Sequence, residues 1–228
     1  MIGVVIPAHN EESLIGACLE SIAVASQCAR LRGEAVQVVV VCDHCSDDTR
    51  SVAHRWKAET LKLDARNVGQ ARAAGAEFAL RAGARWLAFT DADTQVSPQW
   101  LSEQLALDVD AVCGTIGVAR WSVYGPRMKE HFRLTYTDCD GHRHVHGANL
   151  GVSAQAYRLA GGFGALASGE DVALVEALQR SGVRIAWSAR PRVTTSARAD
   201  FRAPGGFGAT LSRIERDHSW AGHTQLAA

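Results

Sequence analysis

The feature that most constrains the fold is a regular alternation of short apolar runs and helix-like segments through the first half of the chain. The apolar runs are typical of strands, and they occupy residues 4–6, 36–41 and 86–90, with a short strand also expected at Leu61-Lys62-Leu63. The segments between them repeat apolar or small side chains at helical spacing, most clearly over residues 12–25 and 69–82. Strands that alternate with helices in this way favour a mainly parallel sheet with crossover helices. The expected fold class is therefore α/β.

Capping residues indicate two further helix starts. Ser46 precedes Asp47 and Asp48, and a serine cap followed by acidic residues suits the positive end of a helix dipole. Ser97-Pro98 combines a capping serine with a proline at the first helical position.

The second half of the chain is less regular. We expect strands over residues 111–118 and 146–152 and a helix over residues 171–181. Beyond Ala199 the sequence turns to glycine, arginine and proline, which predicts a mobile tail or lid. No linker or internal repeat divides the sequence, so we expect one domain over residues 1–228.

Composition excludes several classes of protein. The 228 residues carry 24 basic and 24 acidic side chains, and a net charge of zero argues against nucleic acid as the main partner. No apolar run reaches the roughly 18 residues that a membrane span needs, and the first residues lack the basic start of a signal peptide. The six cysteines are scattered through apolar or mixed surroundings, as in a reduced protein of the cytosol. We therefore expect a cytoplasmic protein without a membrane span.

Two acids follow the fourth expected strand directly. Asp91-Ala92-Asp93 comes after residues 86–90, so a buried strand delivers both carboxylates to the edge where open α/β sheets bind ligands. Alternate residues of an extended segment point the same way, and two neighbouring carboxylates repel each other unless a positive charge lies between them. A divalent cation that carries phosphates is the candidate ligand.

Polar residues also follow the first two apolar runs. The first run ends in Pro7-Ala8-His9-Asn10-Glu11-Glu12 without a Gly-x-Gly-x-x-Gly pattern, which argues against a dinucleotide, although such a polar turn can hold a nucleoside. The second run ends near Asp43, where an acid can accept hydrogen bonds from a base N–H or a ribose hydroxyl. The alternative is that Asp43 caps the next helix.

Two more motifs lie at predicted helix starts. Asn67-Val68-Gly69-Gln70-Ala71-Arg72 offers backbone N–H groups and an arginine that suit an anion, or else a cap and a surface arginine. Gly169-Glu170-Asp171 offers either two acids that stabilise a helix N-terminus or a carboxylate general base in a cleft.

The order and spacing of these motifs resemble the family 2 glycosyltransferases, which are inverting nucleotide-sugar enzymes with a GT-A fold. The resemblance runs from Val4 to about Arg198 and includes His-Gly-Ala-Asn at residues 146–149 and Gly-Gly-Phe at residues 161–163. It implies a single GT-A domain with a nucleotide-binding half at residues 1–95, an acceptor-binding half at residues 96–198 and a tail at residues 199–228.

On the donor side, the resemblance implies a nucleoside pocket and a metal site. The pocket would be lined by Pro7, Ala8, His9 and Glu11. Asp43 would bind the base, and Arg72 would help to hold the nucleotide of a UDP- or GDP-linked sugar. Asp91 and Ala92 would lie near the ribose or sugar, and Asp93 would coordinate Mn²⁺ or Mg²⁺ through the diphosphate.

On the acceptor side, the resemblance implies a cleft flanked by Gly147, Ala148 and Asn149. Asp171 would be the general base that deprotonates the acceptor hydroxyl, and Glu170 would support it or contact the acceptor. The acceptor would be a carbohydrate, a lipid or a small molecule, and a lipid acceptor would bring peripheral association with a membrane.

One feature of the family is missing. Many members carry a histidine on a late strand as a further metal ligand, but residues 193–198 contain none. Arg198 or Arg202 is the alternative, because either cation could neutralise the diphosphate from a tail that closes over the donor.

Three other patterns leave alternatives open. A redox or zinc site is one interpretation of Cys42-x-x-Cys45, although no second such pair exists. Three alternating histidines would share one face of a strand, as transition-metal ligands, as a polar strand edge near the acceptor, or as acceptor contacts; they are His142, His144 and His146. Aromatic residues between the acid motifs could stack on an acceptor or pack in the core; they are Trp121, Tyr124, Phe132 and Tyr136.

Two other functions also remain open. A nucleotidyltransferase of similar architecture should have a glycine-rich, basic loop after its first strand, whereas that turn is acidic here. A non-catalytic nucleotide-binding protein would be favoured if Asp171 proved dispensable.

Overall fold

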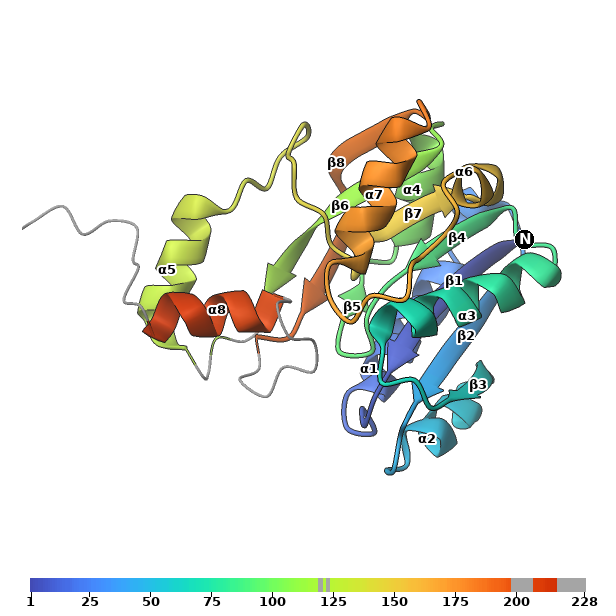
Figure 1. Ribbon diagram of the computed structural model, residues 1–228, viewed down its shortest axis with the longest axis horizontal. Coiled ribbons are helices and arrows are strands. Elements are labelled where there is room, and N and C mark those ends of the chain that lie inside the picture. Colours follow the sequence, from blue (N-terminus) through green and yellow to red (C-terminus); the bar gives the residue numbers. More distant parts are fainter. Residues whose placement is uncertain (119–120, 122–123, 198–206, 217–228) are drawn as a thin grey trace, which may run out of the picture.

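The computed structural model describes residues 1–118, 121, 124–197 and 207–216. Within them, an 8-stranded mixed sheet has the order β3-β2-β1-β4-β7-β6-β8-β5, with helices against both faces (Figure 1). The strands are β1 (Ile2–Ala8), β2 (Val36–Asp43), β3 (Glu59–Leu63), β4 (Trp86–Phe89), β5 (Gln95–Val96), β6 (Ala111–Val118), β7 (Leu150–Ser153) and β8 (Ile185–Thr195). The α-helices are α1 (Ile15–Ser26), α2 (Thr49–Arg55), α3 (Val68–Arg81), α4 (Trp100–Ala106), α5 (Gly125–Thr135), α6 (Ala154–Leu159), α7 (Glu170–Arg180) and α8 (Phe207–Arg216), and a short 3₁₀ turn covers Ala29–Leu31.

The first half of the sheet is parallel, as the strand–helix alternation predicts. β1 pairs in parallel with β2 and with β4, and β2 pairs in parallel with β3. All four residues of β4 are buried, which explains its continuous apolar run. The carboxyl ends of these strands therefore meet at one edge of the sheet.

The second half departs from a simple parallel sheet. β7 is antiparallel to both β4 and β6, whereas β6 and β8 are parallel. The expected strand over residues 146–152 starts later, at Leu150, because the residues before it form a loop. Since β7 runs backwards, its first residue lies at the edge where β4 ends, and this loop is brought to that edge.

Both helix starts predicted from serine caps are wrong. α2 begins at Thr49 after Asp48, and α4 begins at Trp100 after Gln99. Ser46 instead binds the turn after β1, because its N–H donates to Asn10 Oδ1 at 2.8 Å. Ser97 donates its N–H to the Arg192 carbonyl oxygen at 2.9 Å and so joins β8.

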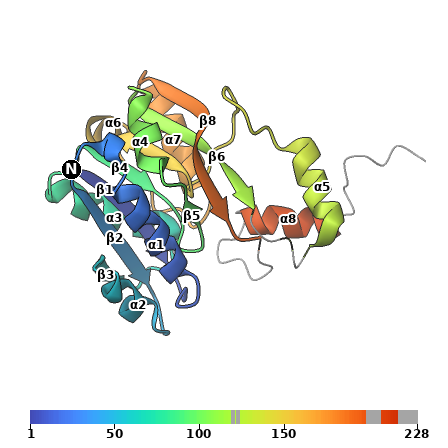
Figure 2. The same cartoon turned by 180° about the vertical axis from the view of Figure 1, so that it is seen from behind.

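Small residues let α3 lie close to the sheet. A Cβ atom on Gly75 would come within 2.4 Å of Val5 Cγ1 and 3.0 Å of Val41 Cγ2, so a larger side chain there would push the helix away. Helices α3, α6 and α7 cover this face with one apolar cluster, and α1, α2 and α4 cover the other face with a second (Figures 1 and 2).

Helices α5 and α8 lie side by side beyond one end of the sheet (Figures 1 and 2). Tyr124, Met128 and Leu211 belong to a third apolar cluster between them, and Tyr124 Oη lies 2.9 Å from Ser212 Oγ. The part of the predicted tail that the structure describes is thus a packed helix. Among the described residues, no helix is long and apolar enough to cross a membrane.

Candidate active site

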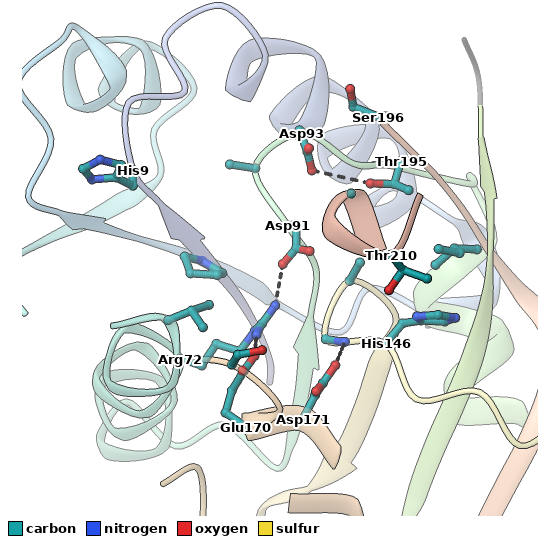
Figure 3. Close-up of a pocket in the computed structure, with 18 of the residues that line it drawn as sticks. His9, Arg72, Asp91, Asp93, His146, Glu170, Asp171, Thr195, Ser196 and Thr210 are labelled. Atoms are coloured by element: carbon teal, nitrogen blue, oxygen red, sulfur yellow. Dashed lines mark hydrogen bonds and ion pairs between the residues drawn. The ribbon is translucent and has the colours of Figure 1, made fainter. Parts of the chain in front are cut away.

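A cavity of about 1030 Å³ opens at the carboxyl ends of β1, β2 and β4 (Figure 3). Most of the site residues predicted from the sequence line it: Pro7, Ala8, His9, Glu11, Asp43, Arg72, Asp91, Ala92, Asp93, Gly147, Ala148, Glu170 and Asp171. Asn149 lies behind the wall and is 1% exposed. Arg198 and Arg202 lie outside the described residues.

The turn after β1 is bound to the end of β2. His9 Nδ1 donates to the Asp43 carbonyl oxygen at 2.8 Å, and the Glu11 N–H donates to Thr49 Oγ1 at 2.7 Å. Asn10 has a positive φ of 53°, a conformation that asparagine tolerates better than most residues. These contacts fix a polar turn as one wall of the cavity.

Asp43 organises the neighbouring loop between β3 and α3. Its carboxylate is 5% exposed and accepts three backbone hydrogen bonds of 2.7–2.9 Å, from the N–H groups of Ala65, Arg66 and Asn67. The alternative that Asp43 caps the next helix is wrong, because Asp48 is the N-cap of α2. The loop that borders the cavity therefore depends on a buried acid.

Arg72 is a buried cation between two acids. It is 4% exposed, and its guanidinium group binds Asp91 Oδ1 at 2.5 Å on one side and Glu170 Oε1 on the other. Burial lowers the pKa of Arg72, but the charges of Asp91, Glu170 and Asp171 more than offset this and raise it above its ordinary value. The surface-arginine interpretation of this motif is wrong, whereas Asn67 does cap α3 by accepting from the Gln70 N–H at 2.9 Å.

The glycine at position 147 makes room for this cation. A Cβ atom there would lie 2.4 Å from Arg72 Nη2. The backbone of the loop before β7 can therefore pack directly against the guanidinium group.

Asp93 points toward the end of β8 (Figure 3). Thr94 Oγ1 donates to Thr195 Oγ1 at 2.9 Å, and Thr195 Oγ1 donates to Asp93 Oδ1 at 3.5 Å. Burial, followed by the charges of Asp93, Asp91 and Glu11, raises the pKa of the nearby Cys18 thiol. This wall of the cavity is therefore negative, and a threonine hydroxyl faces Asp93 from the late strand.

In the predicted metal site, Asp93 is the one protein ligand that the sequence assigns. Across residues 1–118, 121, 124–197 and 207–216, no three His, Cys, Asp or Glu side chains form a group that could hold a metal ion. This finding contradicts the zinc and histidine-metal interpretations for those residues. One carboxylate still fits a cation of the Mg²⁺ type, which usually binds one or two carboxylates together with substrate phosphates and water.

Asp171 is held at the start of α7 by backbone groups. Its Oδ2 accepts from the Gly147 N–H at 2.7 Å, and its Oδ1 accepts from the Val172 N–H at 2.8 Å. Its neighbour Glu170 is 4% exposed; burial raises the pKa of Glu170, and the Arg72 charge opposes this shift. The two adjacent acids therefore differ, since Glu170 is used in a buried ion pair while Asp171 faces the cavity.

Asn149 supports this region from inside the core. Its Oδ1 accepts from Trp100 Nε1 at 2.9 Å, and its Nδ2 donates to the carbonyl oxygens of Thr115 and Pro191 at 2.7 and 2.9 Å. The amide group therefore joins the loop before β7 to α4, β6 and β8 instead of facing the cavity.

The acceptor-side wall contains a stack of aromatic rings. The Phe132 and Tyr136 ring centroids lie 4.5 Å apart, and those of Tyr136 and His144 lie 4.1 Å apart. His142 and His146 flank His144 at 5.5 and 5.8 Å with nearly parallel rings. The three histidines lie in a loop, not on the edge of a strand, and their rings stack instead of converging.

Sequence reasoning missed several contributions to the cavity, among them those of Thr195, Leu211 and Ile214. Thr195 lies in the late segment where a histidine was sought, and Leu211 and Ile214 line the cavity from α8. Leu211 and Ile214 have the spacing of one face of a helix. This spacing was the sequence signal that could have identified them, in a segment otherwise rich in glycine and arginine.

Comparisons with known proteins agree with this architecture. The sequence pattern that defines glycosyl transferase family 2 matches residues 3–160. No curated protein matches the chain by sequence.

Solved structures of glycosyltransferases share the fold. The chain is similar to S. aureus TarS in complex with UDP-GlcNAc, with 15% identity, a TM-score of 0.68, and coverage of 94% of this chain and 65% of that one. A mannosyltransferase from Pyrobaculum calidifontis, in complex with GDP-Man and Mn²⁺, gives 20% identity, a TM-score of 0.64, and coverage of 94% and 60%. Glucosyl-3-phosphoglycerate synthase from Mycobacterium tuberculosis, in complex with Mn²⁺, UDP and glucosyl-3-phosphoglycerate, gives 17% identity, a TM-score of 0.58, and coverage of 95% and 76%. The fold is therefore GT-A, and the chain spans under two thirds of the length of the first two structures.

Proposed function

The chain belongs to glycosyl transferase family 2, and from this premise we propose that it moves a sugar from a nucleoside-diphosphate sugar to an acceptor hydroxyl, with inversion at the anomeric carbon. The observation that carries the proposal is the position of Asp171. A carboxylate held by the Gly147 N–H at 2.7 Å opens into the same cavity as Asp43 and Asp93. A base and a donor pocket in one cavity are the two requirements of a single displacement.

The donor is proposed to bind between the turn after β1 and the loop that Asp43 organises. Pro7, Ala8, His9 and Glu11 would line the nucleoside, and Asp43 would accept from the base. Arg72 would act on the nucleotide mainly through Asp91, because its guanidinium group is buried between two acids. This arrangement supports a donor site within residues 1–95.

The diphosphate would lie against Asp93 and Ala92. Asp93 would hold Mn²⁺ or Mg²⁺ together with the phosphate oxygens, and when bound, the cation would compensate the charge of the departing diphosphate. The Mn²⁺ complexes of two similar structures support this part of the proposal. Arg198 remains a proposed partner of the diphosphate on the tail.

Asp171 would accept the proton that is released in the chemical step. The acceptor oxygen forms a bond to the anomeric carbon while the bond from that carbon to the phosphate oxygen breaks, and its electron pair leaves with the nucleoside diphosphate. The hydroxyl proton passes to the Asp171 carboxylate. Glu170 would support Asp171 through Arg72, while Gly147 and Ala148 would flank the acceptor cleft within residues 96–198 and Asn149 would support them from the core.

Calorimetry tests the donor half of the proposal. UDP, GDP and CDP are titrated with and without Mn²⁺, and at least one should bind with higher affinity in its presence. A screen of nucleotide-sugars for donor hydrolysis then identifies the sugar. If no nucleoside diphosphate binds and no nucleotide-sugar is hydrolysed, the proposed function is wrong.

A further inference from the structure

His146 lies beside the proposed general base. It directly precedes Gly147, whose N–H donates to Asp171 Oδ2 at 2.7 Å, so the peptide that follows His146 is fixed against the carboxylate. The imidazole is one of the groups that line the cavity (Figure 3). An acceptor whose hydroxyl reaches Asp171 therefore also lies near this ring.

Tyr136 is the hydrogen-bond partner of one nitrogen of His146. The Ile116 N–H donates to Tyr136 Oη at 2.9 Å, which leaves the phenol hydrogen available for a second contact. That contact is to His146 Nε2, also at 2.9 Å. When the phenol donates to Nε2, a neutral His146 carries its proton on Nδ1.

The surroundings of His146 keep the ring in place and uncharged. His144 lies 5.8 Å away and Tyr136 lies 5.9 Å away, both with rings inclined by less than 30°. Burial lowers the pKa of His146 to about 4; the charge of His144 adds to this effect, and that of Asp171 opposes it. At neutral pH the ring therefore presents an uncharged N–H, which suits a neutral oxygen better than a phosphate.

In this tautomer, the Nδ1–H group has a donor position that no described residue uses. Among the described residues, the one hydrogen-bond partner of the His146 side chain is Tyr136, at Nε2. We infer that Tyr136 donates to Nε2 and that His146 is a specificity-determining residue whose Nδ1–H donates to an oxygen adjacent to the attacking hydroxyl, so that the acceptor subsite selects a vicinal diol, as in a carbohydrate or polyol.

The neighbouring oxygen, and not the attacking one, is the partner for a chemical reason. The attacking hydroxyl gives its proton to Asp171, and a donor on the same oxygen would withdraw the electron density that forms the new bond. This inference rests on the proposed function, because Asp171 as the base fixes where the attacking hydroxyl lies.

The tautomer can be tested without any activity. In ¹⁵N-labelled protein at neutral pH, long-range ¹H–¹⁵N spectra should show a protonated Nδ1 and an unprotonated Nε2 for His146, assigned by its loss in His146→Gln. A protonated Nε2 would overturn the inference, because Nδ1 would then have no hydrogen to donate.

Acceptor choice is tested with two probes that differ by one oxygen. With the nucleotide-sugar found by the hydrolysis screen, sugar transfer to 1,2-propanediol is compared with transfer to 1-propanol at equal concentration. The wild type should prefer the diol by about five-fold, the effect of one neutral hydrogen bond. Equal transfer to both probes, or transfer to neither, contradicts the inference.

Two substitutions separate the hydrogen bond from a structural effect. The amide of Gln reaches the position of Nε2 and can keep the Tyr136 contact, so in His146→Gln the ratio of transfer to 1,2-propanediol over transfer to 1-propanol should fall close to one. The amide of Asn lies nearer the position of Nδ1, so His146→Asn should retain the preference. His54→Gln, at an exposed histidine of α2, is the matched control and should behave as the wild type.

The two proposals can fail separately. If the wild type hydrolyses no nucleotide-sugar, the proposed function and this inference are both wrong. If the wild type hydrolyses a nucleotide-sugar but His146→Gln keeps the diol preference, only this inference is wrong.

Discussion

Replacing Arg72 by methionine tests how much the buried cation contributes to the site. Arg72 and Glu170 have side chains only 4% and 5% exposed, whereas Asp91 is 36% exposed. Without the guanidinium group, Asp91 can turn toward water, but Glu170 keeps an uncompensated buried charge. Breaking such a buried pair costs about 3–5 kcal/mol, and we expect Arg72→Met to lower the free energy of unfolding by this amount.

The pH dependence of the variant follows from Glu170. Burial already raises the pKa of Glu170 in the folded protein, and Arg72 opposes this shift, so removing Arg72 should raise the pKa further. Between the ordinary and the raised pKa the folded state binds the extra proton, so the stability of Arg72→Met should fall as the pH rises through that window. Acidification within the window should therefore restore part of the lost stability.

Urea unfolding provides the measurement, with the slope m checked for constancy. The double variant Arg72→Met/Glu170→Gln should recover most of the loss, because both members of the pair are then uncharged. Asp91→Asn is the matched control, and it should cost less than about 1 kcal/mol because Asp91 is partly exposed. A double variant as unstable as Arg72→Met alone, or a single variant that loses less than about 1 kcal/mol, would refute the reasoning.

Three further predictions concern the acids and the histidine of the cavity. Asp93→Ala should abolish the Mn²⁺-dependent part of nucleotide binding in calorimetry, and unchanged affinity would contradict the metal assignment. Asp171→Asn should keep donor binding and lower turnover by about 10²–10⁴-fold; retained turnover would point to Glu170 as the base. Since the pKa of His146 is lowered to about 4 in the folded protein, the stability it contributes is complete above its ordinary pKa and should fall as the pH drops toward 4, by up to about 3 kcal/mol. His146→Gln should remove this part of the pH profile in urea unfolding, and an unchanged profile would show that another group is responsible.

The parallel half of the fold could be predicted because its signals are local. Residues 36–41 and 86–90 are apolar enough to be buried on both faces, and the small residues of α3 match its close approach to β1 and β2. The acids after these strands fall in one cavity for the same reason, since parallel strands end at one edge. The roles of Asp43, Asp93 and Asp171 stay predictions.

The rest depends on contacts between distant parts of the chain. Arg72 has the sequence environment of a surface arginine, and its burial depends on Glu170, 98 positions away. Tyr124 and Met128 pack α5 against α8. The apolar partners of α5 therefore lie far from it in the sequence. The alternating histidines suggested a strand, but they lie in a loop, where His144 and His146 stack on Tyr136.

The reversed direction of β7 has a consequence for how such an enzyme could diversify. The proposed donor wall follows parallel strands near the start of the chain, whereas the proposed acceptor wall comes largely from one contiguous stretch, from α5 to the loop that enters β7 backwards. Exchange of this stretch between homologous enzymes could therefore alter acceptor choice while the donor wall is inherited unchanged. Chimeras joined within β7 and in β6 before its register shift at Gly114 are natural starting points for redesigning the enzyme.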